Sequence, residues 1–319
     1  MIRADFCMAC SRRFELLTPS FGGWYSIQLS YEHNCASMIL SRYGIISKMT
    51  ANTENIKLIV CDIDSTIIPA GQHEISPRLR EDFHKAMDRG LKIMINTGRH
   101  FTFLQPSLFD DLPMEIIGTI NGACVNRRDG SVIEKHPMSE AQMNAITLLC
   151  LEKGIGLGFK FEDRIVTYAN HRKFVEGYVQ KGTPYELTVL NDTYNRTHHL
   201  KHGYPLGTFL IGADNSVREF IRMVPDLQFA WSFRGGFDVF SSKVTKATSV
   251  ECALREYGLE WENVIAFGDA GNDTPFLKPA AIAVAMENGK DDVKSVADII
   301  APPCAEDGVA RVLEELNLV

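Results

Sequence analysis

Short, continuous apolar runs alternate with helical patterns along most of this chain, and polar residues follow the runs. Residues 58–61 form one such run and precede Asp62 and Asp64, while residues 264–267 precede Asp269. A run of this kind is typical of a parallel strand that is buried on both faces. The alternation of strands with helices predicts an α/β fold with a doubly wound parallel sheet and right-handed crossovers.

Helix signals separate these strands. Ser76 and Pro77 suit the first turn of a helix, and Gly90 suits its end. Ligands of such a sheet bind beyond the carboxyl ends of its strands, where the polar residues lie. Further strands are expected at 91–95, 116–120 and 281–285, and further helices at 245–257 and 309–316.

The pattern changes near residue 137. Ser139 and Gln142 form a capping-box signal for a helix that runs to about residue 153. Apolar residues then alternate over 155–161, which predicts a sheet with one covered and one open face. Strands are expected to join it at 164–168, 206–211 and 228–233, together with a helix at 217–223.

The length of the chain favours two globular parts. At 319 residues it exceeds the commonest domain size. We predict a core domain formed by residues 53–136 and 234–319, and an inserted α+β cap domain at 137–233.

Residues 1–52 differ from the rest. Positions 1–48 hold five basic and three acidic residues, three of the eight cysteines and no sustained period. We predict a disordered or mis-assigned N-terminal extension, and translation from Met49 is a hypothesis that explains it. Cys7 and Cys10 form a single C-x-x-C, whereas a zinc site needs a second pair. The irregular spacing of the cysteines favours free thiols and a cytoplasmic location.

The charge balance argues against two classes of partner. The formal net charge is −7, whereas binding to DNA or RNA usually requires a basic patch. The sequence contains no run of eighteen apolar residues that would span a bilayer. We therefore expect neither nucleic acid nor membrane as a partner, and the sequence carries no signal for the oligomeric state.

Two acidic clusters carry the chemistry. Asp62 and Asp64 follow one strand, and a G-D-x-x-N-D motif at 268–273 follows another. The four fixed letters of that motif would recur by chance about once in 10⁵ positions. We expect Asp62 to act as a nucleophile and Asp64 as a general acid and base, beside a Mg²⁺ ion. Asp269 brings a third carboxylate to this edge, and Asp273 is expected to hold a metal-bound water.

A carboxylate nucleophile beside Mg²⁺ indicates an enzyme that transfers phosphoryl groups. Other polar residues at strand ends are expected to bind the phosphoryl group and the substrate. Thr97 offers a hydroxyl, and Gly98 allows close approach. Lys246 begins a helix, where a cation is unfavourable unless it pairs with an anion such as Asp62. Lys243 is the alternative and suits a solvated turn. The remaining expected substrate contacts are Arg99, Asn121 and Asn272.

Three further features are expected to lie outside the chemistry. His198, His199 and His202 resemble a metal-binding cluster, but their polar surroundings favour a solvated lid loop. Cys61 should point away from Asp62 as a buried thiol. The aromatic residues of the cap are expected to form its core: Phe159, Phe161 and Tyr168.

Together these motifs resemble the haloacid dehalogenase (HAD) superfamily, and within it the Cof-type phosphatases. The resemblance covers roughly residues 55–319 and includes all four family motifs in order. The matching segments are 62–66, 97–99, Lys246 and 268–273. The resemblance implies a Rossmann-like core, a type IIB cap that controls substrate entry, and a small phosphorylated metabolite as substrate.

The same resemblance implies the roles of the acidic residues. Asp62 would form an aspartyl-phosphate, and Asp64 would be the acid and base. Mg²⁺ would be held by Asp62, the backbone carbonyl of Asp64 and Asp269, with Asp273 assisting.

Two positions depart from the family pattern. Ser65 and Ala247 each stand where Gly is usual, and neither change removes a catalytic group. The implied activity is hydrolysis of phosphate monoesters, such as sugar phosphates or phosphorylated cofactors. Two alternatives stay open: a phosphomutase, which uses the same aspartates but excludes water, and a non-catalytic relative that binds a phosphorylated ligand.

Overall fold

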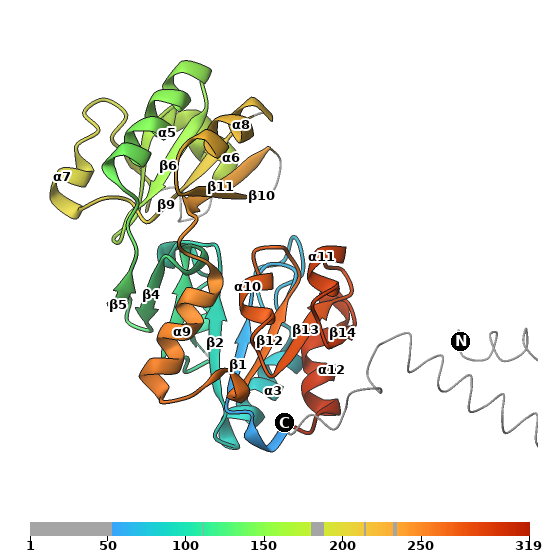
Figure 1. Ribbon diagram of the computed structural model, residues 1–319. Coiled ribbons are helices and arrows are strands. Elements are labelled where there is room, and N and C mark those ends of the chain that lie inside the picture. The colour runs from blue at the N-terminus through green and yellow to red at the C-terminus, as the bar shows by residue number, and fades with distance from the viewer. Residues whose placement is uncertain (1–52, 111, 180–187, 214, 232–234) are drawn as a thin grey trace, which may run out of the picture. The chain divides into compact units, whose positions relative to one another are not determined.

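The computed structural model describes residues 53–110, 112–179, 188–213, 215–231 and 235–319 (Figure 1). The predicted N-terminal extension, with Met49 and the Cys7–Cys10 pair, lies outside these residues. Within the described part of the chain, no helix is both long and apolar enough to cross a membrane. Two sheets organise this part, one of eight strands and one of six.

The eight-stranded sheet contains the predicted parallel strands. Its order is β14-β13-β12-β1-β2-β3-β4-β5, and the strands from β14 to β3 are parallel. Successive strands follow one another from β1 toward one edge of the sheet and from β12 toward the other edge. The predicted doubly wound arrangement is therefore confirmed. The antiparallel strands β4 and β5 extend one edge, which the strand–helix alternation did not predict. The strands are β1 (Leu58–Cys61), β2 (Lys92–Asn96), β3 (Ile116–Thr119), β4 (Cys124–Arg127), β5 (Val132–Lys135), β12 (Val264–Gly268), β13 (Ile282–Met286) and β14 (Ile299–Ala301).

Helices cover both faces of this sheet (Figure 1). On one face, α9, α10 and α11 share a hydrophobic cluster with β1, β12 and β13, while α3 and α12 pack against each other. Ser76 caps α3 as predicted, because its hydroxyl accepts a 3.1 Å hydrogen bond from the backbone N–H of Leu79. The helices are α3 (Pro77–Asp88), α4 (Ser107–Asp110), α9 (Lys246–Tyr257), α10 (Thr274–Leu277), α11 (Asp291–Lys294) and α12 (Gly308–Glu315).

The six-stranded sheet lies in the segment between β5 and α9, and we call residues 138–241 the inserted unit. Its strand order is β10-β11-β9-β6-β7-β8. The predicted capping box is confirmed, since Ser139 and Gln142 exchange hydrogen bonds of 2.8 and 3.2 Å. The strands are β6 (Gly156–Lys160), β7 (Ile165–Ala169), β8 (Leu190–Asn191), β9 (Gly207–Ile211), β10 (Leu227–Trp231) and β11 (Gly236–Ser241), and the helices are α5 (Glu140–Lys153), α6 (His171–Tyr178), α7 (His198–His202) and α8 (Asn215–Met223).

Two expectations for the inserted unit are wrong. Strand β11 pairs with β9 and β10, so the boundary predicted at residue 234 comes too early. The side chains of Phe237 and Val239 on β11 complete the core of the inserted unit, which explains this placement.

The expected open face is the second error. All residues of β6, β7 and β9 are buried. Helices α5 and α8 contribute to the core on one face, and α6 packs on the other. The glycines of β6 make room for α6, because a Cβ on Gly158 would lie 2.2 Å from the ring of Phe174. Glycine in the pattern therefore marks close packing here rather than exposure.

Candidate active site

The two acidic motifs meet where the winding of the sheet reverses. Strands β1 and β12 are neighbours, with Cys61 opposite Phe267. The backbone N–H of Asp62 donates a 3.1 Å hydrogen bond to the Phe267 carbonyl, which extends this pairing by one residue. Asp62 and Asp269 therefore emerge side by side at the carboxyl edge of the sheet, the usual position of a ligand crevice in such folds.

Lys246 joins the two motifs. Its Nζ lies 2.5 Å from Oδ1 of Asp62 and 2.6 Å from Oδ1 of Asp273, and all three side chains are buried. It is the first residue of α9, which Thr245 caps. The competing Lys243 is exposed and pairs instead with Asp226. The expected pairing of Lys246 with Asp62 is therefore confirmed.

Asp273 uses both of its oxygens within the protein. Oδ1 faces Lys246, and Oδ2 accepts hydrogen bonds of 2.9 and 3.0 Å from the backbone N–H groups of Asp269 and Ala270. Gly268 allows this close approach, because a Cβ there would lie 2.5 Å from Cβ of Asp273. Asp273 thus shapes the loop that carries Asp269.

The charges of this group do not balance. Oxygen atoms of Asp62, Asp269 and Asp273 all lie within 4.8 Å of one another. Burial raises the pKa of Asp62, the positive charge of Lys246 lowers it, and the negative charge of Asp273 raises it. Burial and then the charge of Asp273 raise the pKa of Asp269 to about 6. Three carboxylates against one ammonium leave two negative charges, which a divalent cation would neutralise, and oxygen donors suit Mg²⁺.

Asp64 lies outside that group and pairs with Arg99. Nε and Nη2 of Arg99 donate hydrogen bonds of 2.9 and 2.6 Å to its two carboxylate oxygens. The side chain of Asp64 is 59% exposed, so it faces solvent rather than the sheet. The next residue, Ser65, has φ 66°, a left-handed conformation that glycine adopts more readily. Ser65 thus takes the turn expected of the glycine that is usual in the family.

The residues predicted for phosphoryl and substrate binding converge beside this pair. Thr97 is buried at the end of β2, and its Oγ1 accepts a 3.2 Å hydrogen bond from the N–H of Arg99. Asn272 Nδ2 donates to Asn121 Oδ1 at 3.0 Å. A Cβ on Gly98 would lie 3.1 Å from that same oxygen, so a larger residue there would displace the Asn121 side chain. The structure therefore brings together residues from three strand ends.

Two residues of the inserted unit were missed by the sequence reasoning. Lys160, buried on β6, donates a 2.7 Å hydrogen bond to the Gly98 carbonyl and pairs with Asp238 of β11. Burial raises the pKa of Asp238, while Lys160 and a hydrogen bond from Asn121 lower it. The available signal was a lysine between Phe159 and Phe161 in an otherwise apolar strand, which is unusual unless it is paired.

Residues 59–313 match the family model described as haloacid dehalogenase-like hydrolase. The match spans all of the motifs assembled above and most of the chain. The chain belongs to this family.

The haloacid dehalogenase-like hydrolases most similar to it include curated phosphatases. A 5-amino-6-(5-phospho-D-ribitylamino)uracil phosphatase of Bacillus subtilis (strain 168) is 26% identical over 269 residues, which cover 81% of this chain and 95% of the relative. A phosphoglycolate phosphatase of Methanobrevibacter smithii is 26% identical over 266 residues, which cover 83% of this chain and 100% of that relative. A solved structure of a HAD subclass IIB sugar phosphatase superposes with a TM-score of 0.72 at 25% identity. The superposition covers 82% of this chain and 100% of that structure.

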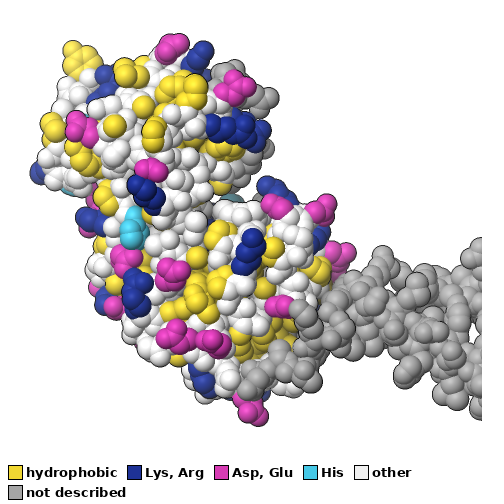
Figure 2. Space-filling view, viewed as in Figure 1, with side chains coloured by type: hydrophobic (Ala, Val, Ile, Leu, Met, Phe, Trp, Pro, Cys, Tyr) yellow, Lys and Arg dark blue, Asp and Glu magenta, His cyan; other side chains and the backbone are white. Residues whose placement is uncertain are grey.

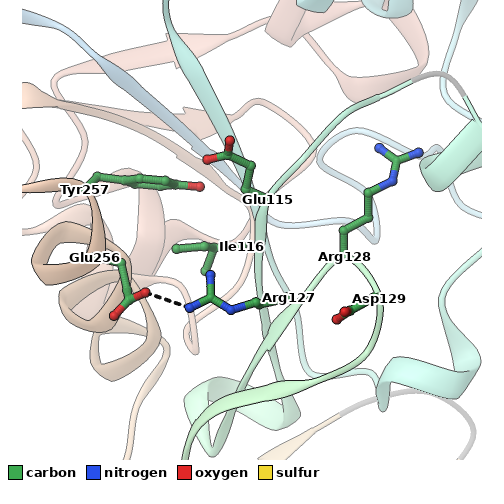
Figure 3. A pocket seen from close by; sticks show the side chains of 7 residues that line it. All are labelled: Glu115, Ile116, Arg127, Arg128, Asp129, Glu256 and Tyr257. Carbon is green, nitrogen blue, oxygen red and sulfur yellow. Dashed lines mark hydrogen bonds and ion pairs between the residues drawn. The ribbon is translucent and has the colours of Figure 1, made fainter.

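A large pocket of this hydrolase lies away from the acidic group. It has a volume of about 660 Å³ and is lined by residues from the start of β3, the end of β4 and the end of α9 (Figure 3). Its charges are paired with one another or with neighbours, as with Arg127 and Glu256 at 3.0 Å or Lys92 and Glu115 at 3.1 Å. Acidic and basic side chains are likewise interspersed over the described face drawn in Figure 2. The pocket is therefore not part of the candidate active site.

The outcome for the three remaining features is mixed. Cys61 is a buried free thiol, as predicted. The aromatic residues expected in the core are buried there: Phe159, Phe161 and Tyr168. The prediction that the histidines lie in a solvated loop is wrong. Residues 198–202 form helix α7, and the side chain of His198 is only 7% exposed beside Asp163.

Proposed function

We propose that this hydrolase is a Mg²⁺-dependent phosphatase acting on phosphate monoesters of small metabolites in the cytoplasm. The observation that carries the proposal is the buried Asp62, held by Lys246 at the sheet edge where Asp269 and Asp273 also converge. The curated relatives are phosphatases, which supports the same reaction class. The cytoplasmic location rests on the five described cysteines, all of which are free thiols.

Asp62 would attack phosphorus and form an aspartyl-phosphate. Lys246 holds Oδ1, so the attack falls to Oδ2. A bond forms between Oδ2 and phosphorus as the bond from phosphorus to the leaving alcohol breaks. Asp64, protonated at one of the two oxygens that otherwise accept from Arg99, gives this proton to the alcohol oxygen. In the second step Asp64 takes a proton from water, water oxygen bonds to phosphorus, and the acyl phosphate bond to Asp62 breaks.

The metal requirement follows from the charge of the group. Asp62 and Asp269 would hold Mg²⁺, with the Asp64 carbonyl as a further ligand and Asp273 fixing the Asp269 loop. The ion would supply positive charge to the phosphoryl oxygens, which otherwise repel a carboxylate nucleophile. Thr97 and the backbone at Gly98 would donate hydrogen bonds to the same oxygens.

The substrate would lie between this edge and the inserted unit. Arg99 and Asn121 come from the core, while Lys160 and Tyr178 come from the inserted unit. The rings of Tyr178 and Phe209 lie 4.6 Å apart, and Lys160 Nζ lies 5.7 Å from the centre of the same Phe209 ring, so Tyr178 and Lys160 lie close together. Burial raises the pKa of Tyr178. Such a mixture of cationic, amide and phenol groups favours a small polar metabolite, as with the ribitylamino-uracil, glycolate and sugar phosphates of the relatives.

The test is phosphate release from a panel of phosphorylated metabolites, with wild type and Asp62→Asn, in Mg²⁺ or in EDTA. We expect release only with both Mg²⁺ and Asp62. Asp226→Asn is the control, since Asp226 is exposed and its φ of 58° suits asparagine. Release by Asp62→Asn at the wild-type rate would overturn the proposal. Transfer of phosphate between metabolites without release would instead support the phosphomutase alternative.

A further inference from the structure

A second group of ligand-type side chains lies in the inserted unit. Asp163 follows β6, and His198 and His202 are the first and last residues of α7. One potential ligand atom of each lies within 4.8 Å of those of the other two. The group shares no residue with the acidic group around Asp62, so it is separate from the candidate active site.

The spacing of these atoms suits one small cation. His198 Nε2 lies 3.0 Å from Asp163 Oδ1, and His202 Nδ1 lies 3.8 Å from Asp163 Oδ2. In a tetrahedral zinc site with bonds of about 2.0–2.2 Å, neighbouring ligand atoms lie about 3.4 Å apart. The His198 distance is somewhat shorter than this value, and the His202 distance is slightly longer and runs to the other carboxylate oxygen. One oxygen of Asp163 and one nitrogen of each histidine lie within 4.8 Å of one another.

His202 alone has to turn for coordination. The rings of His198 and His202 are parallel to within 3°, with centroids 4.1 Å apart, and parallel rings do not direct their lone pairs at one point. The side chain of His202 is 36% exposed, whereas that of His198 is 7% exposed. The His202 ring therefore has room to rotate about its Cβ–Cγ bond, a soft torsion.

Neighbouring residues hold the other two ligands in place. The spacing of four residues puts His198 and His202 on one side of α7. Asp192 Oδ2 accepts a 2.9 Å hydrogen bond from the backbone N–H of His198. Arg164 Nε donates a 2.8 Å hydrogen bond to Asp163 Oδ2, which leaves Oδ1 facing His198. Such contacts from outside the ligand set commonly orient metal ligands.

We propose that Asp163, His198 and His202 form a transition-metal site, for which Zn²⁺ is the fitting ion. Two imidazoles and one carboxylate favour Zn²⁺, Ni²⁺ or Cu²⁺, whereas Mg²⁺ takes oxygen ligands. Three protein ligands leave one tetrahedral position for water. The ion links α7 to the turn between β6 and β7 and so acts as a cross-link within the inserted unit.

The test is calorimetric titration of the full-length protein with Zn²⁺, after removal of metals with EDTA and dialysis into Mg²⁺ buffer. Wild type is expected to bind Zn²⁺ at least about tenfold more tightly at this site than His202→Asn does. His84→Asn, which removes an exposed histidine from α3, should bind like wild type. Zn²⁺ taken up by Cys7 and Cys10 or by the carboxylate group would be common to all three proteins, so their difference isolates the histidine group.

Two further measurements guard against misfolding. In EDTA, His202→Asn is expected to keep the circular dichroism spectrum and melting temperature of wild type, because His202 lies at the surface. Co²⁺ is expected to give stronger visible absorption, typical of a tetrahedral site, in wild type and His84→Asn than in His202→Asn, since any absorption from Cys7 and Cys10 is common to all three proteins. Equal Zn²⁺ affinity of wild type and His202→Asn would overturn the proposal and leave the three residues as hydrogen-bonded side chains only.

Discussion

Arg99 donates two hydrogen bonds, of 2.9 and 2.6 Å, to the carboxylate of Asp64. Arg78 makes a pair of the same kind with Glu314 on the outer surface, at 3.0 and 2.6 Å. Exposed ion pairs contribute about 0–1 kcal/mol to stability. We therefore expect the Arg99 pair to add little to stability. Because it orients the proposed acid and base, its main effect should be on catalysis, and the Arg78 pair provides a matched comparison.

Replacing Arg99 separates these roles. We expect Arg99→Ala to lower kcat/KM by about 10- to 100-fold, since it removes both a substrate contact and the orientation of Asp64. Its melting temperature should stay within about 2 °C of wild type. Phosphatase kinetics and thermal unfolding would measure both, with Arg78→Ala as the control that keeps full activity. Full activity in Arg99→Ala would show that Arg99 neither binds substrate nor positions Asp64.

The buried ammonium of Lys246 predicts a large effect on stability. Lys246→Met leaves Asp62 and Asp273 without their cation, and removing one partner of a buried pair costs about 3–5 kcal/mol. Urea unfolding in EDTA would measure this loss, and Mg²⁺ should restore part of it. The exposed Lys243 serves as the control, because Lys243→Met should change the free energy of unfolding by less than about 0.5 kcal/mol. Equal effects at the two lysines would contradict the proposed charge balance.

The left-handed backbone of Ser65 predicts a stabilising substitution. At φ 66° a residue with a Cβ costs about 1–2 kcal/mol relative to the right-handed region, and glycine avoids this cost. After the greater chain entropy of glycine is counted, Ser65→Gly should raise the free energy of unfolding by about 0.5–1 kcal/mol. Ser65→Ala keeps the Cβ and should give no such gain. Chemical denaturation of the three proteins would measure their free energies of unfolding. A lower value for Ser65→Gly than for wild type would contradict the prediction.

His100 predicts how stability changes with pH. It is buried, with Nε2 at 2.7 Å from the Phe161 carbonyl, and burial lowers its pKa to about 4. In the unfolded chain its pKa is about 6.5. Between these values only the unfolded chain takes up the proton, so the stabilisation is complete above pH 6.5 and falls as the pH drops toward 4. The difference corresponds to about 3 kcal/mol.

The measurement for His100 is the free energy of unfolding in EDTA across this pH range. His100→Gln keeps a donor for the Phe161 carbonyl but cannot titrate. Wild type should therefore lose about 3 kcal/mol more than this variant between pH 6.5 and 4, since other titrating groups are common to both. Parallel curves for the two proteins would be inconsistent with a neutral buried His100.

Much of the core was predictable because its signals are local. The apolar run of β1, the Ser76 cap and the stop at Gly90 each depend on adjacent residues, and the structure agrees with all three. Pairing between strands was harder to predict. The sequence pattern of β11 would suit a strand of either sheet. Only its hydrogen bonds to β9 and β10 assign it to the inserted unit.

The family, the doubly wound core and the identity of the acidic motifs were all predictable from the chain's residues, because they depend on short patterns at the ends of strands. The pairing of Lys246 with Asp62 was expected as well. Its second contact with Asp273, the Arg99–Asp64 pair and the hydrogen bond from Lys160 to the Gly98 carbonyl follow only from the packed fold. Each of these contacts joins residues far apart in the chain or depends on the direction in which a side chain points. The burial that makes them strong arises only when the sheets and helices pack together.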